Sequence, residues 1–134
     1  MGHAERRALG EKEKDLKQQL QALQENNLLS IYCMGESEKE KNVQNRKDIF
    51  AKQLKVLKDL NIEKALIGYE PVWSIGVNGT PAEAGYVEES FVAIKSVLTE
   101  LGFCFCPNSR NKFSKSTPCA IRELIPPAFS ALAP

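Results

Sequence analysis

Apolar residues recur at helical spacing between residues 11 and 24. Charged residues and glutamines fill the positions between three leucines that stand four and three residues apart, Leu16, Leu20 and Leu23. This pattern predicts a helix over residues 11–24. The Asn26-Asn27 pair is a suitable end for it, because asparagine tolerates the left-handed backbone conformation that often ends a helix.

Two short apolar runs lie further along the chain, at residues 28–34 and 65–69. Both are mostly apolar and do not alternate between apolar and polar positions, which is typical of strands buried on both faces of a parallel sheet. Gly35 closes the first run, and Glu70 follows the second. The pattern therefore predicts two buried strands.

Two more helices are expected. Ser37 with Glu40 fits a capping box, which predicts a helix over residues 38–60. Its apolar stripe consists of Val43, Phe50, Leu54 and Leu57. The segment Thr80-Pro81-Ala82-Glu83 predicts the start of the next helix, which Gly102 ends. The apolar positions of that helix are Val87, Phe91, Ile94, Leu98 and Leu101.

The predicted order of helix, strand, helix, strand, helix indicates a parallel α/β architecture. Two strands alone would leave both edges of the sheet exposed and much of each apolar helix stripe uncovered. We therefore expect these elements to be an excerpt of a larger α/β domain, and to pack loosely on their own.

The composition excludes some classes of partner. The chain of 134 residues is 43% hydrophobic and 26% charged, and its net charge of +1 gives no electrostatic reason to expect a nucleic acid or an anionic membrane. No apolar run reaches the roughly 18 residues of a membrane span. The first residues are charged, unlike a signal peptide, so we expect a cytoplasmic protein with reduced cysteines.

The composition changes near Gly102. Residues 103–134 carry a net charge of +3 and hold three of the four cysteines, Cys104, Cys106 and Cys119. These cysteines resemble a zinc half-site only loosely, because the two-residue gap usual between ligand cysteines is missing. We interpret them as incidental. His3 is the only histidine, so no metal site can be built from a histidine pair, and a lone histidine near a terminus is usually solvated.

Glu70 is the first candidate for chemistry. It ends an apolar strand, and Pro71 restricts its backbone to extended conformations. Parallel α/β folds place their sites at the carboxyl ends of strands, where a carboxylate can act as a general base. On spacing alone the alternative is favoured, namely a solvated carboxylate without a function.

Three segments, in order along the chain, resemble motifs of the triosephosphate isomerase family. Gly2-His3-Ala4-Glu5-Arg6-Arg7 resembles the family's Gly-His-Ser-Glu-Arg-Arg motif, and Ile31-Tyr32-Cys33-Met34-Gly35-Glu36 is similar to its fifth strand. Tyr69-Glu70-Pro71-Val72-Trp73-Ser74-Ile75-Gly76 resembles the sixth strand and the mobile loop. The resemblance covers residues 2–102. It implies an α/β fold that is part of a (β/α)8 TIM barrel, from about helix 4 to helix 6.

The resemblance also implies roles for single residues. Glu70 corresponds to the general base that moves a proton between adjacent carbons of glyceraldehyde 3-phosphate or dihydroxyacetone phosphate. His3 corresponds to the neutral histidine that polarises the carbonyl, and Gly76 to a loop residue whose N–H contacts the phosphate. The family uses neither cofactor nor metal, acts in glycolysis and gluconeogenesis, and consists of homodimers at full length.

Some positions depart from the family pattern. Ala4 replaces a serine, and Val77-Asn78-Gly79-Thr80 resembles family members that act on other short sugar phosphates. Residues 103–134 show neither the expected Gly-Gly phosphate loop nor a regular period, so we expect an unrelated or frame-shifted, poorly ordered tail after a domain of residues 1–102. Two alternatives to an isomerase stay open, a truncated product without activity and a protein whose Lys/Glu-rich helices bind a partner.

Overall fold

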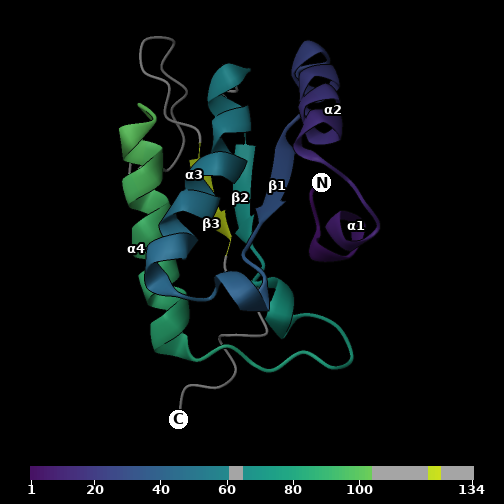
Figure 1. Ribbon diagram of the computed structural model, residues 1–134. Coiled ribbons are helices and arrows are strands. Elements are labelled where there is room, and N and C mark those ends of the chain that lie inside the picture. The colour runs from purple at the N-terminus through teal and green to yellow at the C-terminus, as the bar shows by residue number, and fades with distance from the viewer. Residues whose placement is uncertain (61–64, 104–120, 125–134) are drawn as a thin grey trace.

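The computed structural model describes residues 1–60, 65–103 and 121–124. Its elements alternate between helix and strand over most of this length (Figure 1). They are α1 (Ala4–Ala8), α2 (Glu13–Glu25), β1 (Ser30–Met34), η1 (Glu38–Glu40), α3 (Val43–Asp59), β2 (Ala65–Tyr69), η2 (Val72–Ser74), α4 (Ala84–Glu100) and β3 (Ile121–Leu124). No helix within these ranges has the length and apolarity needed to cross a bilayer.

The strands form a parallel sheet in the order β1-β2-β3. Ser30 pairs with Ala65 and Met34 pairs with Tyr69, so β1 and β2 end side by side. This confirms the prediction that the strands at 28–34 and 65–69 are parallel neighbours. Both arrowheads point toward the end of the molecule where η2 and the loop to α4 lie (Figure 1). The residues that follow the two strands, Gly35 and Glu70, therefore meet at one edge.

The hydrophobic core lies between the sheet and the helices. The rings of Phe50 on α3 and Phe91 on α4 pack edge-on against Tyr69 at centroid distances of 5.8 and 5.7 Å. The predicted stripe residues Phe50, Leu54 and Leu57 are fully buried in this core. Arg46 of α3, 2% exposed, donates to Ser90 Oγ of α4 at 2.9 Å and stacks on the ring of Tyr86. The two helices are thus joined by polar as well as apolar contacts.

Both predicted helix starts were wrong. The capping box of Ser37 and Glu40 forms, but it closes only the short η1, and α3 begins at Val43. The first turn of α3 forms instead where the main-chain carbonyl oxygen of Asn42 accepts the Arg46 N–H at 3.0 Å. In the second case Thr80 is held by Trp73, whose carbonyl oxygen accepts the Thr80 N–H at 3.2 Å. Residues 80–83 are not helical, Glu83 is extended, and α4 begins at Ala84.

The expectation of strands buried on both faces was also wrong. Tyr32 and Cys33 are buried, but Ile31 is 47% exposed, and alternate positions of β2 are only partly buried. Ile31 and Cys33 share one face of β1, so the cover on that face is confined to the carboxyl end of the strand, where Cys33 is buried.

The tail contains a strand that was not predicted. Ile121–Leu124 pairs in parallel with β2, and Ala65 stands opposite Ile121. The prediction that residues 103–134 pack little against the rest is therefore wrong for this segment. Short four-residue strands without alternation offer little periodic signal, which is why this one was missed. The rest of the expected disordered tail, and the cysteines at 104, 106 and 119, lie outside the described residues.

Candidate functional site

His3 and Glu70 are in direct contact although they stand 67 residues apart in the sequence. The imidazole Nδ1 of His3 lies 2.9 Å from Glu70 Oε1 and 3.2 Å from Oε2. An ionised carboxylate only accepts hydrogen bonds, so Nδ1 donates in this pair. The His3 side chain is 55% exposed and that of Glu70 19%. The two residues singled out by the sequence thus share one solvent-accessible site.

The main chain next to His3 also contacts Glu70. Ala4 has no hydroxyl, but its N–H donates to Glu70 Oε2 at 3.4 Å. Ala4 is the first residue of α1, a short helix that was not predicted because it has a single turn and no apolar stripe. Glu70 is therefore held from two sides by the segment around His3.

Cys33 is a third member of the site that the sequence reasoning did not single out. Its Sγ lies 3.8 Å from His3 Nε2, and the side chain is buried at the end of β1. Burial, followed by the charge and hydrogen bond of Glu70, raises the pKa of Cys33 to about 11. The group is therefore a thiol at neutral pH. Its position two residues before Gly35, near the end of the predicted strand, could have marked it as a site residue.

The backbone of residues 1 and 2 lies along the edge of β1, and this fixes the position of His3, the next residue. The Cys33 N–H donates to the Met1 carbonyl oxygen at 2.8 Å, and the terminal amine donates to the Ile31 carbonyl oxygen at 2.8 Å. Gly2 has φ +73°, and a Cβ on it would lie 2.7 Å from the Cys33 carbonyl oxygen. Only glycine fits here. The turn directs His3 toward the end of β2.

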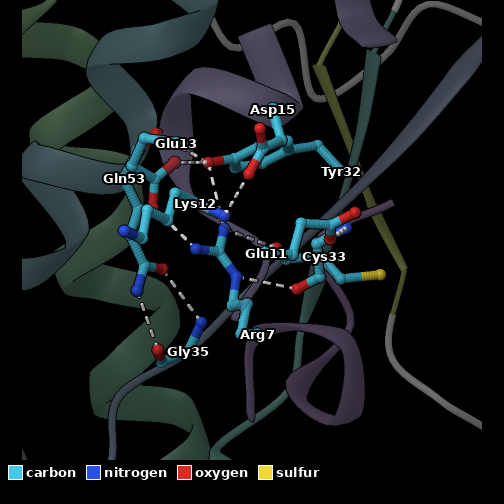
Figure 2. A network of polar contacts seen from close by, with 10 residues as sticks. Arg7, Glu11, Lys12, Glu13, Asp15, Tyr32, Cys33, Gly35 and Gln53 are labelled. Atoms are coloured by element: carbon cyan, nitrogen blue, oxygen red, sulfur yellow. Dashed lines mark hydrogen bonds and ion pairs between the residues drawn. The ribbon is translucent and has the colours of Figure 1, made fainter. Parts of the chain in front are cut away.

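The Arg7 side chain holds the turn at Gly2 in place. Its Nε donates to the Gly2 carbonyl oxygen at 2.8 Å, and Nη1 pairs with Glu13 at 2.6 Å. Figure 2 shows its guanidinium at the centre of a polar network, with the Cys33 sulfur pointing away from it. The same guanidinium donates to the Tyr32 hydroxyl at 3.2 Å and to the Cys33 carbonyl oxygen at 3.4 Å. One half-buried cation therefore links the turn before His3 with the end of β1.

The end of β1 is held by a side chain of α3. The Gln53 amide donates to the Gly35 carbonyl oxygen at 3.0 Å and accepts the Gly35 N–H at 3.1 Å (Figure 2). Beyond it, the Glu70 N–H donates to the Met34 carbonyl oxygen at 2.7 Å. Glu70 is thus positioned by a main-chain bond to the end of β1.

A second carboxylate, Glu36, was missed as a functional residue. It is fully buried, and accepts hydrogen bonds from three ring donors, the hydroxyls of Tyr69 and Tyr86 and the indole N–H of Trp73, at 3.0, 2.7 and 2.9 Å. Burial and the bond with Glu36 raise the pKa of Tyr86 to about 12. Glu36 follows the end of a strand just as Glu70 does, and this position in the sequence could have marked it as a site residue. It anchors the first residues of the loop after Glu70.

Gly76, the expected phosphate contact, lies in the exposed part of that loop. Its carbonyl oxygen accepts the Gly79 N–H at 3.1 Å. Within the described residues, no hydrogen bond joins Gly76 to His3 or Glu70. The neighbouring Val77 is fully exposed. The structure thus brings His3 and Glu70 together but leaves Gly76 apart from them.

A carboxylate lies beside an imidazole, and both groups can act in general acid–base catalysis. In the neutral ring with Nδ1 protonated, Nε2 is an acceptor. The imidazole must therefore turn or change tautomer before Nε2 can donate to another group.

Comparisons with known proteins give the family to which the chain is similar. Residues 1–103 match the family model of triosephosphate isomerase. A triosephosphate isomerase of Ruthia magnifica subsp. Calyptogena magnifica is 36% identical over 107 residues, which are 75% of this chain and 42% of that protein. The triosephosphate isomerase of Clostridium novyi (strain NT) is 33% identical over 103 residues, 73% of this chain and 41% of that protein. A third triosephosphate isomerase, from Campylobacter jejuni subsp. doylei, is 37% identical over 99 residues. These residues are 72% of this chain and 44% of that protein.

The chain spans about two-fifths of the length of these relatives. The family model ends at residue 103, just after α4, so β3 lies beyond it. The match nonetheless includes every residue of the site, from His3 to Gly76. The parallel strands, their order along the chain and the matched length all lead to one conclusion: the chain belongs to the triosephosphate isomerase family and is part of a (β/α)8 barrel.

Proposed function

We propose that His3 and Glu70 are the catalytic pair of an aldose–ketose isomerase that interconverts glyceraldehyde 3-phosphate and dihydroxyacetone phosphate in the cytoplasm. The observation that carries the proposal is the contact of 2.9 Å between the His3 imidazole and the Glu70 carboxylate at the carboxyl end of β2. The family's role for these two positions supports it. The matched residues correspond to the barrel from about helix 4 to helix 6.

The chemistry follows from the two side chains. Glu70 removes a proton from the carbon next to the substrate carbonyl, and the electron pair of that C–H bond forms an enediolate whose charge rests on oxygen. His3 donates a hydrogen bond to this oxygen. The hydroxyl proton on the carbon that lost its hydrogen passes to this oxygen, which leaves a new carbonyl there, and Glu70 returns its proton to the former carbonyl carbon. Because His3 and Glu70 now bond to each other, substrate must enter between them and replace this bond.

The loop after Glu70 would cover the substrate. Trp73 and Glu36 fix its start, and Thr80 is tied back to Trp73 at 3.2 Å, so the exposed residues between them form a closed loop that can move as a unit. We propose that the N–H of Gly76 meets the substrate phosphate when this loop folds down. Val77 and Asn78 depart from the family pattern. This favours a second candidate function of the same class, the isomerisation of another short sugar phosphate.

A chimera tests the proposal. Residues 1–103 replace the matching part of the Clostridium novyi relative, which supplies the remainder of a barrel, and kcat/KM is measured with glyceraldehyde 3-phosphate. Glu70→Gln should lower it by about 10² to 10⁴, the usual contribution of a general base. Glu25→Gln, at an exposed carboxylate of α2 outside the family motifs, is the control. A folded chimera that keeps its rate with Glu70→Gln would contradict the proposal. A preference for a four-carbon aldose phosphate would favour the second candidate.

A further inference from the structure

His3, Cys33 and Glu70 form the one group of three or more His, Cys, Asp or Glu side chains, within the ranges that the structure describes, whose donor atoms could hold a metal ion. One nitrogen, one sulfur and one oxygen lie within 4.8 Å of one another. The expectation of no metal rested on the single histidine, on the spacing of the cysteines after Gly102 and on the family resemblance. None of these predicts a mixed set of ligands drawn from three separate segments.

The donor types are those of zinc. Imidazole nitrogen, thiolate sulfur and carboxylate oxygen all bind Zn²⁺, at about 2.0 to 2.3 Å, and three such ligands with an open fourth position are the usual set of accessible zinc sites. Tetrahedral ligands at these bond lengths stand roughly 3.3 to 3.8 Å apart. The distance of 3.8 Å between His3 Nε2 and Cys33 Sγ falls in this range. The sulfur ligand disfavours Mg²⁺ and Ca²⁺.

We propose that His3 Nε2, Cys33 Sγ and a Glu70 carboxylate oxygen form a binding site for a zinc ion. Cys33 is fixed on β1 by its main-chain bond to Met1, so it defines the position of the ion. The half-exposed His3 ring provides both an adjustable ligand and an entry path from solvent. On binding, the thiol proton leaves to solvent, the hydrogen bond between Nδ1 and Glu70 is exchanged for a metal bond to each residue, and a water molecule fills the fourth position.

The site goes beyond the proposed isomerase, which uses no metal. Zinc and sugar phosphate would compete, since the ion would occupy the base and the imidazole together. That competition rests on the proposed function, but metal binding itself does not. It can therefore be tested without an activity assay.

The test uses the full chain with Cys104, Cys106 and Cys119 each replaced by serine, so that Cys33 is the only cysteine left. Cobalt, a spectroscopic substitute for zinc, is titrated in and the near-ultraviolet absorption of a thiolate–cobalt bond is measured. We expect one ion per chain, displaced by zinc. Cys33→Ser should abolish the band, and His3→Gln and Glu70→Gln should each weaken binding by about tenfold or more, since even the loss of a supporting residue costs that much. Glu5→Gln should leave the affinity unchanged.

Three results would overturn the site. They are the absence of a thiolate band in the parent chain, a band that survives Cys33→Ser, and equal affinity in the parent and the Glu70→Gln variant. Cobalt held by His3 and the terminal amine alone would lack the band and so counts against the proposal. His3 and Glu70 are partly exposed, so their variants are expected to fold, and circular dichroism of each variant checks this.

Discussion

Gly35 lies directly against the main chain of Glu70. A Cβ on Gly35 would overlap the Glu70 carbonyl oxygen and approach the nitrogen of Pro71. The ends of β1 and β2 can therefore come together only because residue 35 has no side chain. This close approach places the carboxylate of Glu70 over Cys33 and within reach of His3.

Gly35→Ala should consequently destabilise the fold. The added methyl group would collide with the main chain of Glu70 and Pro71, which cannot move aside as a flexible side chain would. We therefore expect a loss of about 1–3 kcal/mol in the free energy of unfolding. Urea denaturation measures it. The matched control is Gly85→Ala in α4, where a Cβ meets nothing within 4 Å. That change should stabilise the chain by about 0.4–1 kcal/mol. Equal effects of the two substitutions would show that the close approach is not required.

Glu36→Gln should loosen the start of the loop after Glu70. The amide turns a donor toward at least one of the three ring donors that Glu36 accepts, which should cost about 1–3 kcal/mol. Trp73 is the only tryptophan, so its emission reports this site directly. We expect a shift to longer wavelength as the indole is released to solvent. Glu88→Gln on the exposed face of α4 should change neither emission nor stability, and an unchanged spectrum in Glu36→Gln would contradict the proposed anchor.

The stability should depend on pH through Glu11. Burial acts to raise the pKa of this carboxyl, but hydrogen bonds from Gln19 and Arg6 outweigh it, and the pKa is lowered from 4.5. A lowered folded pKa contributes stability above the unfolded value, and this contribution is lost as pH falls through the folded value. Between about pH 5 and pH 3, Glu11→Gln should therefore lose less stability than the parent. Glu25→Gln, an exposed carboxyl of α2, should follow the parent curve; identical curves for all three would rule out the role of Glu11.

The isolated chain should isomerise glyceraldehyde 3-phosphate no faster than its His3→Gln, Glu70→Gln double variant. Within the described residues, no hydrogen bond or ion pair joins a lysine or arginine to His3 or Glu70, so the site holds no contacting cation to position or neutralise a phosphate-bearing substrate. A coupled assay with a large amount of protein measures the rate. A clear excess of the parent over the double variant would show that the pair acts without further barrel segments.

The sequence predicted the alternation of helices and strands and the parallel pairing, and the family motifs singled out His3 and Glu70 as site residues. Their direct contact was not predicted. Cys33 and Glu36 were not predicted as site residues. Their importance depends on the register that sets β1 beside β2, which no local pattern of residues contains. The helix starts failed for a related reason. A capping box closes a single turn as readily as a long helix, so Ser37 and Glu40 were satisfied without starting α3.

The contact between His3 and Glu70 joins positions 67 residues apart, whereas Arg7 reaches Tyr32 across 25. Closing a longer loop costs more chain entropy, so contacts of long range tend to form after local ones. We expect the N-terminal unit of α1, α2 and β1 to assemble around Arg7 first. His3 and Glu70 can meet only when α3 has returned the chain to β2. The acid–base pair is thus a late product of folding, and destabilising changes anywhere between residues 3 and 70 should separate it.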